Sequence, residues 1–189
     1  GISMLTNADI IAIENGVTNY KQLENAGIKN RIDDLIYAWE IYRKQEDPNG
    51  STLFQRVEYW KASVEIIKKN LILGVGTGDL PATFNEYYNN TNSSLQPAFR
   101  NRSHNQFLAI AVGLGITGLI IFLISLIYPI LITKAWKNEY FISFFLIALF
   151  SMFSDDTLET QAGLTFFIVF YSLFIFTGYL PNKGIEKIS

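Results

Sequence analysis

The stretch RNRSHNQFLAIAVGLGITGL, which forms residues 100–119, marks the point where this chain changes from a polar to an apolar composition. Two arginines precede His104, the single histidine, and no residue after it carries a formal charge until Lys134. An apolar run of this length is sufficient for a membrane span, which needs about 20 residues. The sequence therefore predicts that His104 lies at the entrance of a transmembrane helix.

His104 is a titratable group beside fixed positive charge. An imidazole changes its protonation near neutral pH, and ionisable residues at the edge of the hydrocarbon layer are usually functional. The pattern indicates a site for an amphiphilic anionic substrate. The alternative is that His104 only helps to cap the helix that follows it.

The composition favours a membrane protein. Of the 189 residues, 49% are hydrophobic and only 17% are charged, which is more apolar than a typical soluble domain. The net charge of -2 provides no global basic field, so we expect no nucleic-acid partner. The absence of cysteine excludes disulfides, thiolate catalysis and cysteine metal sites, and with one histidine we expect no metal and no cofactor.

The apolar half contains three candidate spans, at about residues 116–133, 140–156 and 160–180. Residues 107–114, which precede Gly115, predict a separate short helix that is re-entrant or interfacial. Pro129 is expected to kink the first span because it removes a backbone donor. The second span is short, and we expect it to continue past Asp155 or to lie in a thinned bilayer.

The predicted fold class is all-α, a polytopic membrane protein fragment with about three C-terminal transmembrane helices. Residues 1–105 form an extracytoplasmic (periplasmic) helical loop region, residues 106–180 the transmembrane region, and residues 181–189 a cytoplasmic tail. The chain opens without the basic and apolar segments that would carry residues 1–105 across a membrane, so we expect upstream membrane helices. A soluble protein with buried apolar helices remains the alternative.

The orientation follows from the lysines. The positive-inside rule places on the cytoplasmic face the lysines that follow the first and third spans, namely Lys134, Lys137, Lys183 and Lys187. The acidic cluster of Asp155, Asp156 and Glu159 then lies outside, on the same side as His104. These carboxylates have three possible roles: to orient His104, to bind acceptor sugars, or to end a helix.

The outer half contains two predicted helices. Residues 32–43 form the first, a turn at residues 47–50 ends it, and Ser51 is the expected N-cap of the second. In the second helix an apolar stripe recurs at helical spacing, comprising Leu53, Val57, Trp60, Val64 and Ile67. Arg56 lies beside this stripe, either at the rim of a packed interface or as a solvated arginine with its stem on Trp60.

Three glycines at alternate positions follow this helix: Gly74, Gly76 and Gly78. They match neither the dinucleotide-binding pattern nor the P-loop pattern. We expect a tight backbone turn that returns the chain toward the membrane, and an anion held by its backbone amides is the second possibility.

Four segments, in order and spacing, resemble the C-terminal region of the O-antigen ligase and O-antigen polymerase superfamily. They are RVEYW from Arg56, GVGTG from Gly74, HNQFL from His104 and GLGITGL from Gly113. The resemblance covers about residues 53–125. Complete members are about twice as long, so we expect this fragment to be inactive alone.

The resemblance implies a metal-independent membrane glycosyltransferase in the bacterial inner membrane, with its active site on the periplasmic side. It would move a glycan from an undecaprenyl-diphosphate carrier to an acceptor hydroxyl, and lipid A core, a second glycan and protein are all possible acceptors. The sequence leaves ligase, polymerase and protein O-oligosaccharyltransferase open. The alternative outside the enzymes is a non-catalytic transporter or scaffold subunit.

The resemblance also implies roles for individual residues. His104 is the general base or orients the acceptor, and Arg56 stabilises the charge that develops on the diphosphate. Five further residues are expected to bind substrate, namely Arg100, Arg102, Asn105, Gly76 and Gly78.

Overall fold

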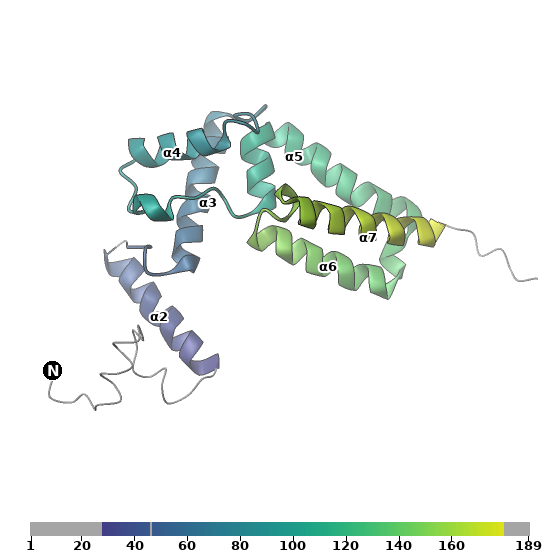
Figure 1. The fold of residues 1–189 in the computed structure, drawn as a ribbon, viewed down its shortest axis with the longest axis horizontal. Coiled ribbons are helices and arrows are strands. Elements are labelled where there is room, and N and C mark those ends of the chain that lie inside the picture. Colours follow the sequence, from purple (N-terminus) through teal and green to yellow (C-terminus); the bar gives the residue numbers. More distant parts are fainter. Residues whose placement is uncertain (1–27, 46, 180–189) are drawn as a thin grey trace, which may run out of the picture. The chain divides into compact units, whose positions relative to one another are not determined.

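The structure is a computed structural model that describes residues 28–45 and 47–179. These residues form six α-helices, three short 3-10 helices and no strand (Figure 1), which confirms the all-α prediction. The expected cytoplasmic tail, residues 181–189, lies outside the described residues. The chain divides into two compact units, residues 1–54 and 55–189, and each is described by itself.

The first unit contains α2 (Ile28–Gln45), which includes the helix expected at residues 32–43. After it, the Asp47 carboxylate accepts hydrogen bonds from the backbone and side chain of Asn49, so the predicted turn forms. Phe54 is buried, and its ring stacks on Tyr42 with the centroids 4.7 Å apart. Aromatic packing of this kind is the main tertiary contact of the short unit.

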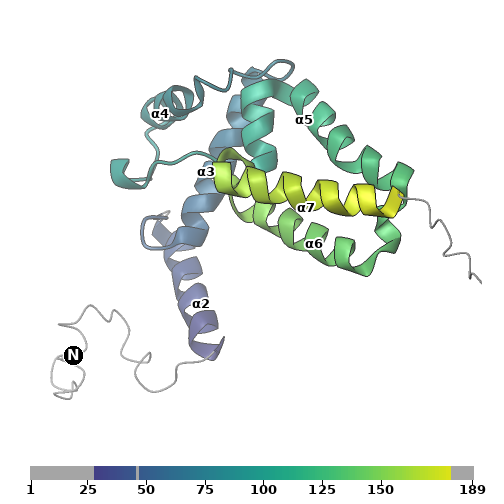
Figure 2. The same ribbon diagram turned by 45° about the vertical axis from the view of Figure 1, so that its right-hand side comes forward.

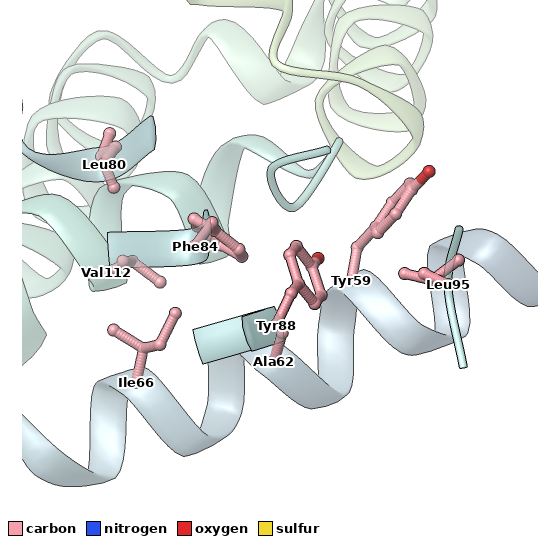
Figure 3. Close-up of a cluster of buried hydrophobic side chains, with 8 residues drawn as sticks. All are labelled: Tyr59, Ala62, Ile66, Leu80, Phe84, Tyr88, Leu95 and Val112. Atoms are coloured by element: carbon pink, nitrogen blue, oxygen red, sulfur yellow. The ribbon is translucent and has the colours of Figure 1, made fainter. Parts of the chain in front are cut away.

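The second unit is built on α3 (Thr52–Lys69), which starts directly after Ser51. Next come α4 (Leu80–Asn90) and the 3-10 helix η3 (Pro97–Phe99). Buried side chains of α3 and α4 meet Leu95 and Val112 in one cluster (Figure 3). Those from the two helices are Tyr59, Ala62, Ile66, Leu80, Phe84 and Tyr88.

The buried face of α3 differs from the apolar stripe predicted from its sequence. Tyr59, Ala62 and Ile66 are at most 3% exposed, whereas Trp60 and Val64 of the predicted stripe are 39% and 42% exposed. Ala62 lies in one buried cluster with Phe84 and Tyr88 of α4, so this face of α3 is the one that packs against α4. The predicted core face of α3 was therefore wrong for these two residues.

Helix α5 (Gln106–Thr133) is broken at Gly115, whose φ of 69° and ψ of -172° are not helical. Figures 1 and 2 both show its two limbs running in different directions. The first limb, residues 106–114, corresponds to the separate short helix predicted from the sequence. The second limb, residues 116–133, keeps helical dihedral angles at Pro129, so the break lies at the glycine and not at the proline.

The glycine turn after α3 fills the break in α5. Its backbone donates from Val75 to Val112, over 2.9 Å, and from Gly76 to Gly113, over 2.8 Å. A Cβ atom on Gly115 would lie 2.2 Å from the carbonyl oxygen of Ile72, so only glycine permits this approach. The prediction of a tight backbone turn is confirmed.

The remaining helices are α6 (Glu139–Ser154) and α7 (Gln161–Tyr179), each preceded by a 3-10 helix, η4 (Ala135–Lys137) and η5 (Thr157–Glu159). Helices α5, α6 and α7 pack against one another around Leu126, Met152 and Phe167. Helix α6 ends at Ser154 and does not continue past Asp155 as expected, because Asp155 has an extended backbone.

One helix of the described part, α5, is long and apolar enough to cross a membrane, with a mean hydropathy of 2.7. Residues 139–154 and 161–176 are apolar helices that are shorter than that criterion requires. Length and composition therefore support one span directly.

Candidate functional site

The site forms where the segment before α5 meets the segment between α6 and α7. The backbone N–H of Asn105 donates to Oδ1 of Asp156, over 2.9 Å. One residue further on, the side-chain oxygen of Gln106 accepts a hydrogen bond from the backbone of Leu158, over 2.7 Å. Two segments about 50 positions apart in sequence are thereby fixed side by side.

Asn105 is the N-cap of α5. Its side-chain oxygen accepts from the backbone N–H groups of Phe107 and Leu108, each over 3.0 Å, and its amide nitrogen donates to the carbonyl oxygen of Phe153. A capping asparagine satisfies backbone donors that the first helical turn leaves free. The side chain is 5% exposed, so the structure places Asn105 as a support for its neighbour His104.

His104 adopts a left-handed backbone conformation with a φ of 43°. Its ring lies 5.7 Å from the ring of Tyr59, and its Nδ1 atom is 3.1 Å from Oδ1 of Asp155. An ionised carboxylate only accepts hydrogen bonds, so Nδ1 must carry the proton. In the neutral ring Nε2 is then unprotonated, and the side chain is 38% exposed.

The two aspartates of this segment have opposite electrostatic environments. The hydrogen bond from His104 is the main cause that lowers the pKa of Asp155, and the nearby charge of Arg56 lowers it further. Burial raises the pKa of Asp156, and the negative charge of Glu159 adds to the increase. Asp155 is therefore the carboxylate that stays ionised beside the imidazole.

Arg56 lies half-buried on α3, within electrostatic range of the site. Its charge lowers the pKa of both Asp155 and Tyr59, although burial leaves the pKa of Tyr59 raised overall. Among residues 28–45 and 47–179, no carboxylate lies within ion-pair distance of its guanidinium. Within the described residues its positive charge is therefore not neutralised by an ion pair.

The two arginines before His104 point to different partners. Arg102 donates to Glu159 over 2.6 Å and lies 3.9 Å from Asp156, so it belongs to the site. Arg100 instead donates to the side chain of Asn89 over 2.7 Å. The structure therefore brings together His104, Arg56 and Arg102 but directs Arg100 to the end of α4.

The glycines predicted to bind substrate lie near the C-terminal end of the first limb of α5, whereas His104 precedes its N-terminal end. The N–H of Gly76 is used by the carbonyl of Gly113, and nothing lies within 4 Å of the position that a Cβ atom on Gly78 would take. A cavity of about 390 Å³ extends between these ends. It is lined by Thr77, Leu80, Arg102, Gln106, Ala109, Ile110, Leu114 and Glu159.

His104, Asp155 and Asp156 offer three ligand atoms that lie within 4.8 Å of one another. The donor set does not favour a divalent cation. One oxygen of Asp155 already accepts from His104 and from the backbone of Asp156, and the guanidinium of Arg102 faces Asp156. A cation at this position would compete with these donors and with the positive charge of two arginines.

Sequence reasoning missed two residues that hold the segment in front of His104. Trp60 donates from its indole nitrogen to the carbonyl of Ser103, over 3.0 Å, and the hydroxyl of Tyr59 donates to the carbonyl of Phe99. The spacing of Tyr59 and Trp60 after Arg56 was visible in the sequence, but only their partners reveal this role.

A family model described as O-antigen ligase matches residues 10–123, which is more than half of the chain and includes both Arg56 and His104. No curated protein matches the chain.

Proposed function

The chain belongs to the O-antigen ligase family, and we propose that it supplies the catalytic groups of a membrane glycosyltransferase. The proposed reaction moves a glycan from an undecaprenyl-diphosphate carrier to an acceptor hydroxyl. The contact between His104 and Asp155, beside an arginine without a carboxylate partner in the described residues, is the observation that carries the proposal.

A glycosyl diphosphate already contains a good leaving group. The enzyme therefore needs to remove the proton of the acceptor hydroxyl and to stabilise the charge that develops on the diphosphate. The acceptor oxygen forms a bond to the anomeric carbon, and the bond from this carbon to the phosphate oxygen breaks. The bonding electron pair leaves with the diphosphate.

His104 is proposed as the general base. With Nδ1 donating to Asp155, the lone pair of Nε2 is directed away from the carboxylate and is available to accept the proton of the acceptor. The imidazolium that results is stabilised by the ionised Asp155. Asp155 thus acts as a positioning residue, because it fixes the tautomer and orientation of the ring.

Arg56 is proposed to bind the diphosphate. Its planar guanidinium donates two parallel hydrogen bonds to a phosphate and stays charged at any physiological pH. Arg102 lines the cavity next to the site and is the second candidate, although it must share its charge with Glu159. Substrate binding by Arg100, Asn105, Gly76 and Gly78 stays a prediction.

We propose that the reaction needs no metal and no cofactor. The support comes from the residues themselves: two arginines provide positive charge for the diphosphate, and one imidazole provides the base. Since the carboxylates next to His104 are engaged with N–H donors, they are poorly available as ligands.

The family is one of membrane proteins, and we propose that this chain crosses the bacterial inner membrane three times. Helices α6 and α7 pack along the second limb of α5, and their charged neighbours lie at the helix ends. Lys134 and Lys137 follow α5, and the positive-inside rule supports the proposal that they lie on the cytoplasmic side and the site with His104 on the periplasmic side.

The acceptor distinguishes three related proposals: lipid A core for a ligase, a glycan for a polymerase, and a protein hydroxyl for a protein transferase. No residue of the described part favours one of them.

The test is a glycan-transfer assay with the full-length protein and purified lipid-linked glycan. His104→Ala should reduce transfer by about 10² to 10⁴ fold, the usual contribution of a general base. Arg56→Ala should also strongly reduce transfer, and Arg56→Lys should restore only part of it, since lysine cannot bind bidentately.

Lys61→Ala is the matched control, because it removes a positive charge from the same helix, where Lys61 forms a surface ion pair with Glu58. Such pairs contribute at most about 1 kcal/mol, so this variant should keep its activity. Wild-type transfer by folded His104→Ala and Arg56→Ala proteins would refute the catalytic assignment and favour a scaffold or transporter role.

A further inference from the structure

Three consecutive apolar side chains are exposed directly after α3. Leu71, Ile72 and Leu73 are 53%, 65% and 77% exposed. We call residues 71–73 the apolar tip. Single exposed apolar residues are ordinary, but three in succession on one turn form a surface that is unfavourable in water and typical of an interaction site.

The apolar tip is attached to the start of the apolar limb of α5. The carbonyl of Leu71 accepts from the N–H of Ile116 over 2.8 Å, and the carbonyl of Ile72 accepts from the hydroxyl of Thr117 over 2.8 Å. Residue 116 is the first of the limb that is apolar enough to cross a membrane. The tip therefore lies at the depth where this limb begins.

The apolar surface continues from the tip onto that limb. Ile116, Ile120 and Ile121 are 38%, 50% and 68% exposed. A hydrocarbon environment that covers the limb would reach its first turn, to which the tip is hydrogen-bonded. We therefore expect the side chains of the tip to be covered by the same partner that covers the adjoining helix surface.

Two backbone groups of the tip are paired within the protein. Polar backbone groups at the lipid boundary need internal partners, because acyl chains provide none. The carbonyls of Leu71 and Ile72 both have donors, and next to the tip the N–H of Gly74 donates back to the carbonyl of Asn70 over 3.0 Å. These carbonyls therefore do not oppose insertion of the adjoining side chains.

Two exposed lysines precede the tip. Lys68 and Lys69 end α3, and the ammonium of Lys68 is 2.6 Å from the carboxylate of Glu65. Lysine stems extend along apolar surface while their charged ends remain at the polar boundary. Phospholipids have negatively charged phosphates next to their acyl chains. Lysines next to an apolar turn could therefore contact the phosphates while the turn contacts the acyl chains.

We propose that the apolar tip inserts into the outer half of the bilayer beside the second limb of α5, with phospholipid acyl chains as its partner. This anchors the glycine turn, and with it the C-terminal end of α3, to the membrane. The proposal depends on the membrane location of the family and not on the catalytic roles of His104 or Arg56.

The test measures lipid contact at one side chain. Leu73→Cys, in a full-length protein with any cysteine outside these 189 residues replaced by serine, is labelled with an environment-sensitive nitrobenzoxadiazole dye and reconstituted into phosphatidylethanolamine and phosphatidylglycerol vesicles. Asn90→Cys, at the exposed end of α4, is the matched control. We expect a blue-shifted emission at residue 73 and quenching by lipids brominated near the headgroup, with neither effect at residue 90.

Two outcomes would overturn the proposal. Emission at residue 73 equal to that at residue 90 would show that the tip lies in water. A blue shift without quenching by any brominated lipid would show that protein covers the tip. Because glycan transfer by the unlabelled wild type is measured separately, loss of this proposal leaves the catalytic one untouched, and the reverse holds as well.

Discussion

Asn105 and Asp156 are joined by a backbone-to-carboxylate hydrogen bond of 2.9 Å, and the residues that precede them, His104 and Asp155, are joined by a side-chain contact of 3.1 Å. Two consecutive residues of one segment thus pair with two consecutive residues of another. The inner pair is buried and fixes the segments, while the outer pair is open to solvent. The buried contact therefore positions the exposed, chemically useful one.

The first prediction concerns Asp155 as a positioning residue. Asp155→Asn should reduce the kcat of glycan transfer, because an amide can pair with either tautomer, accepting from Nδ1–H through its oxygen or donating to an unprotonated Nδ1 through its nitrogen, and does not stabilise the imidazolium. The loss should be smaller than for His104→Ala, and the double variant should be no worse than His104→Ala alone. Kinetics of the four proteins test this, and multiplicative losses would show that the two residues act independently.

The second prediction concerns acid. The pKa of Asp155 in the folded protein is lowered from its unfolded value of 3.8. Its contact with His104 therefore stabilises the fold at pH values above 3.8, and this stabilisation is lost as the pH falls through the lower pKa of the folded state. The difference in apparent Tm between wild type and Asp155→Asn should persist from about pH 7 to pH 5 and shrink below the unfolded value. A difference that grows on further acidification would contradict the assignment.

The third prediction concerns the break in α5. Gly115→Ala places a Cβ atom 2.2 Å from the carbonyl of Ile72 at a positive φ, and backbone strain of this kind costs about 1–3 kcal/mol before the clash is added. The variant should lower the Tm and the yield of folded protein. Gly78→Ala, where the added atom meets nothing within 4 Å, is the control and should fold normally.

The fourth prediction concerns orientation in the membrane. A cysteine at Thr91, after α4, should react with a membrane-impermeant maleimide in cells with permeabilised outer membranes. A cysteine at Asn138, between η4 and α6, should react only after the inner membrane is disrupted. The opposite pattern of labelling would invert the proposed topology.

Local patterns in the sequence predicted much of this fold. The glycine before residue 116 predicted the separate short helix, because glycine permits a conformation that other residues avoid. The three alternating glycines predicted the tight turn, because glycine permits tight backbone turns and because their spacing does not match a phosphate-binding loop. The kink expected at Pro129 stays a prediction, because a proline within an apolar helix removes one hydrogen bond without requiring non-helical dihedral angles at that residue.

The site was harder to predict than the helices. His104 and Arg56 were chosen from motif and resemblance, and the structure gives both a suitable environment. The role of Asp155 depends on a contact across 51 positions, which no local pattern encodes. The buried face of α3 depends on which of its residues pack with the side chains of α4, and an amphipathic pattern with apolar residues on two faces does not settle that choice.

The break at Gly115 also matches the protein to the thickness of a bilayer. An unbroken helix of 28 residues would be about 42 Å long, well beyond a hydrocarbon core of about 30 Å, whereas residues 116–133 alone span about 27 Å. The remaining helical turns, residues 106–114, therefore run in a different direction from the span. The imidazole of His104 lies just before their first residue. In the proposed reaction, this arrangement would let a lipid carrier present its diphosphate to the enzyme without being lifted out of the leaflet.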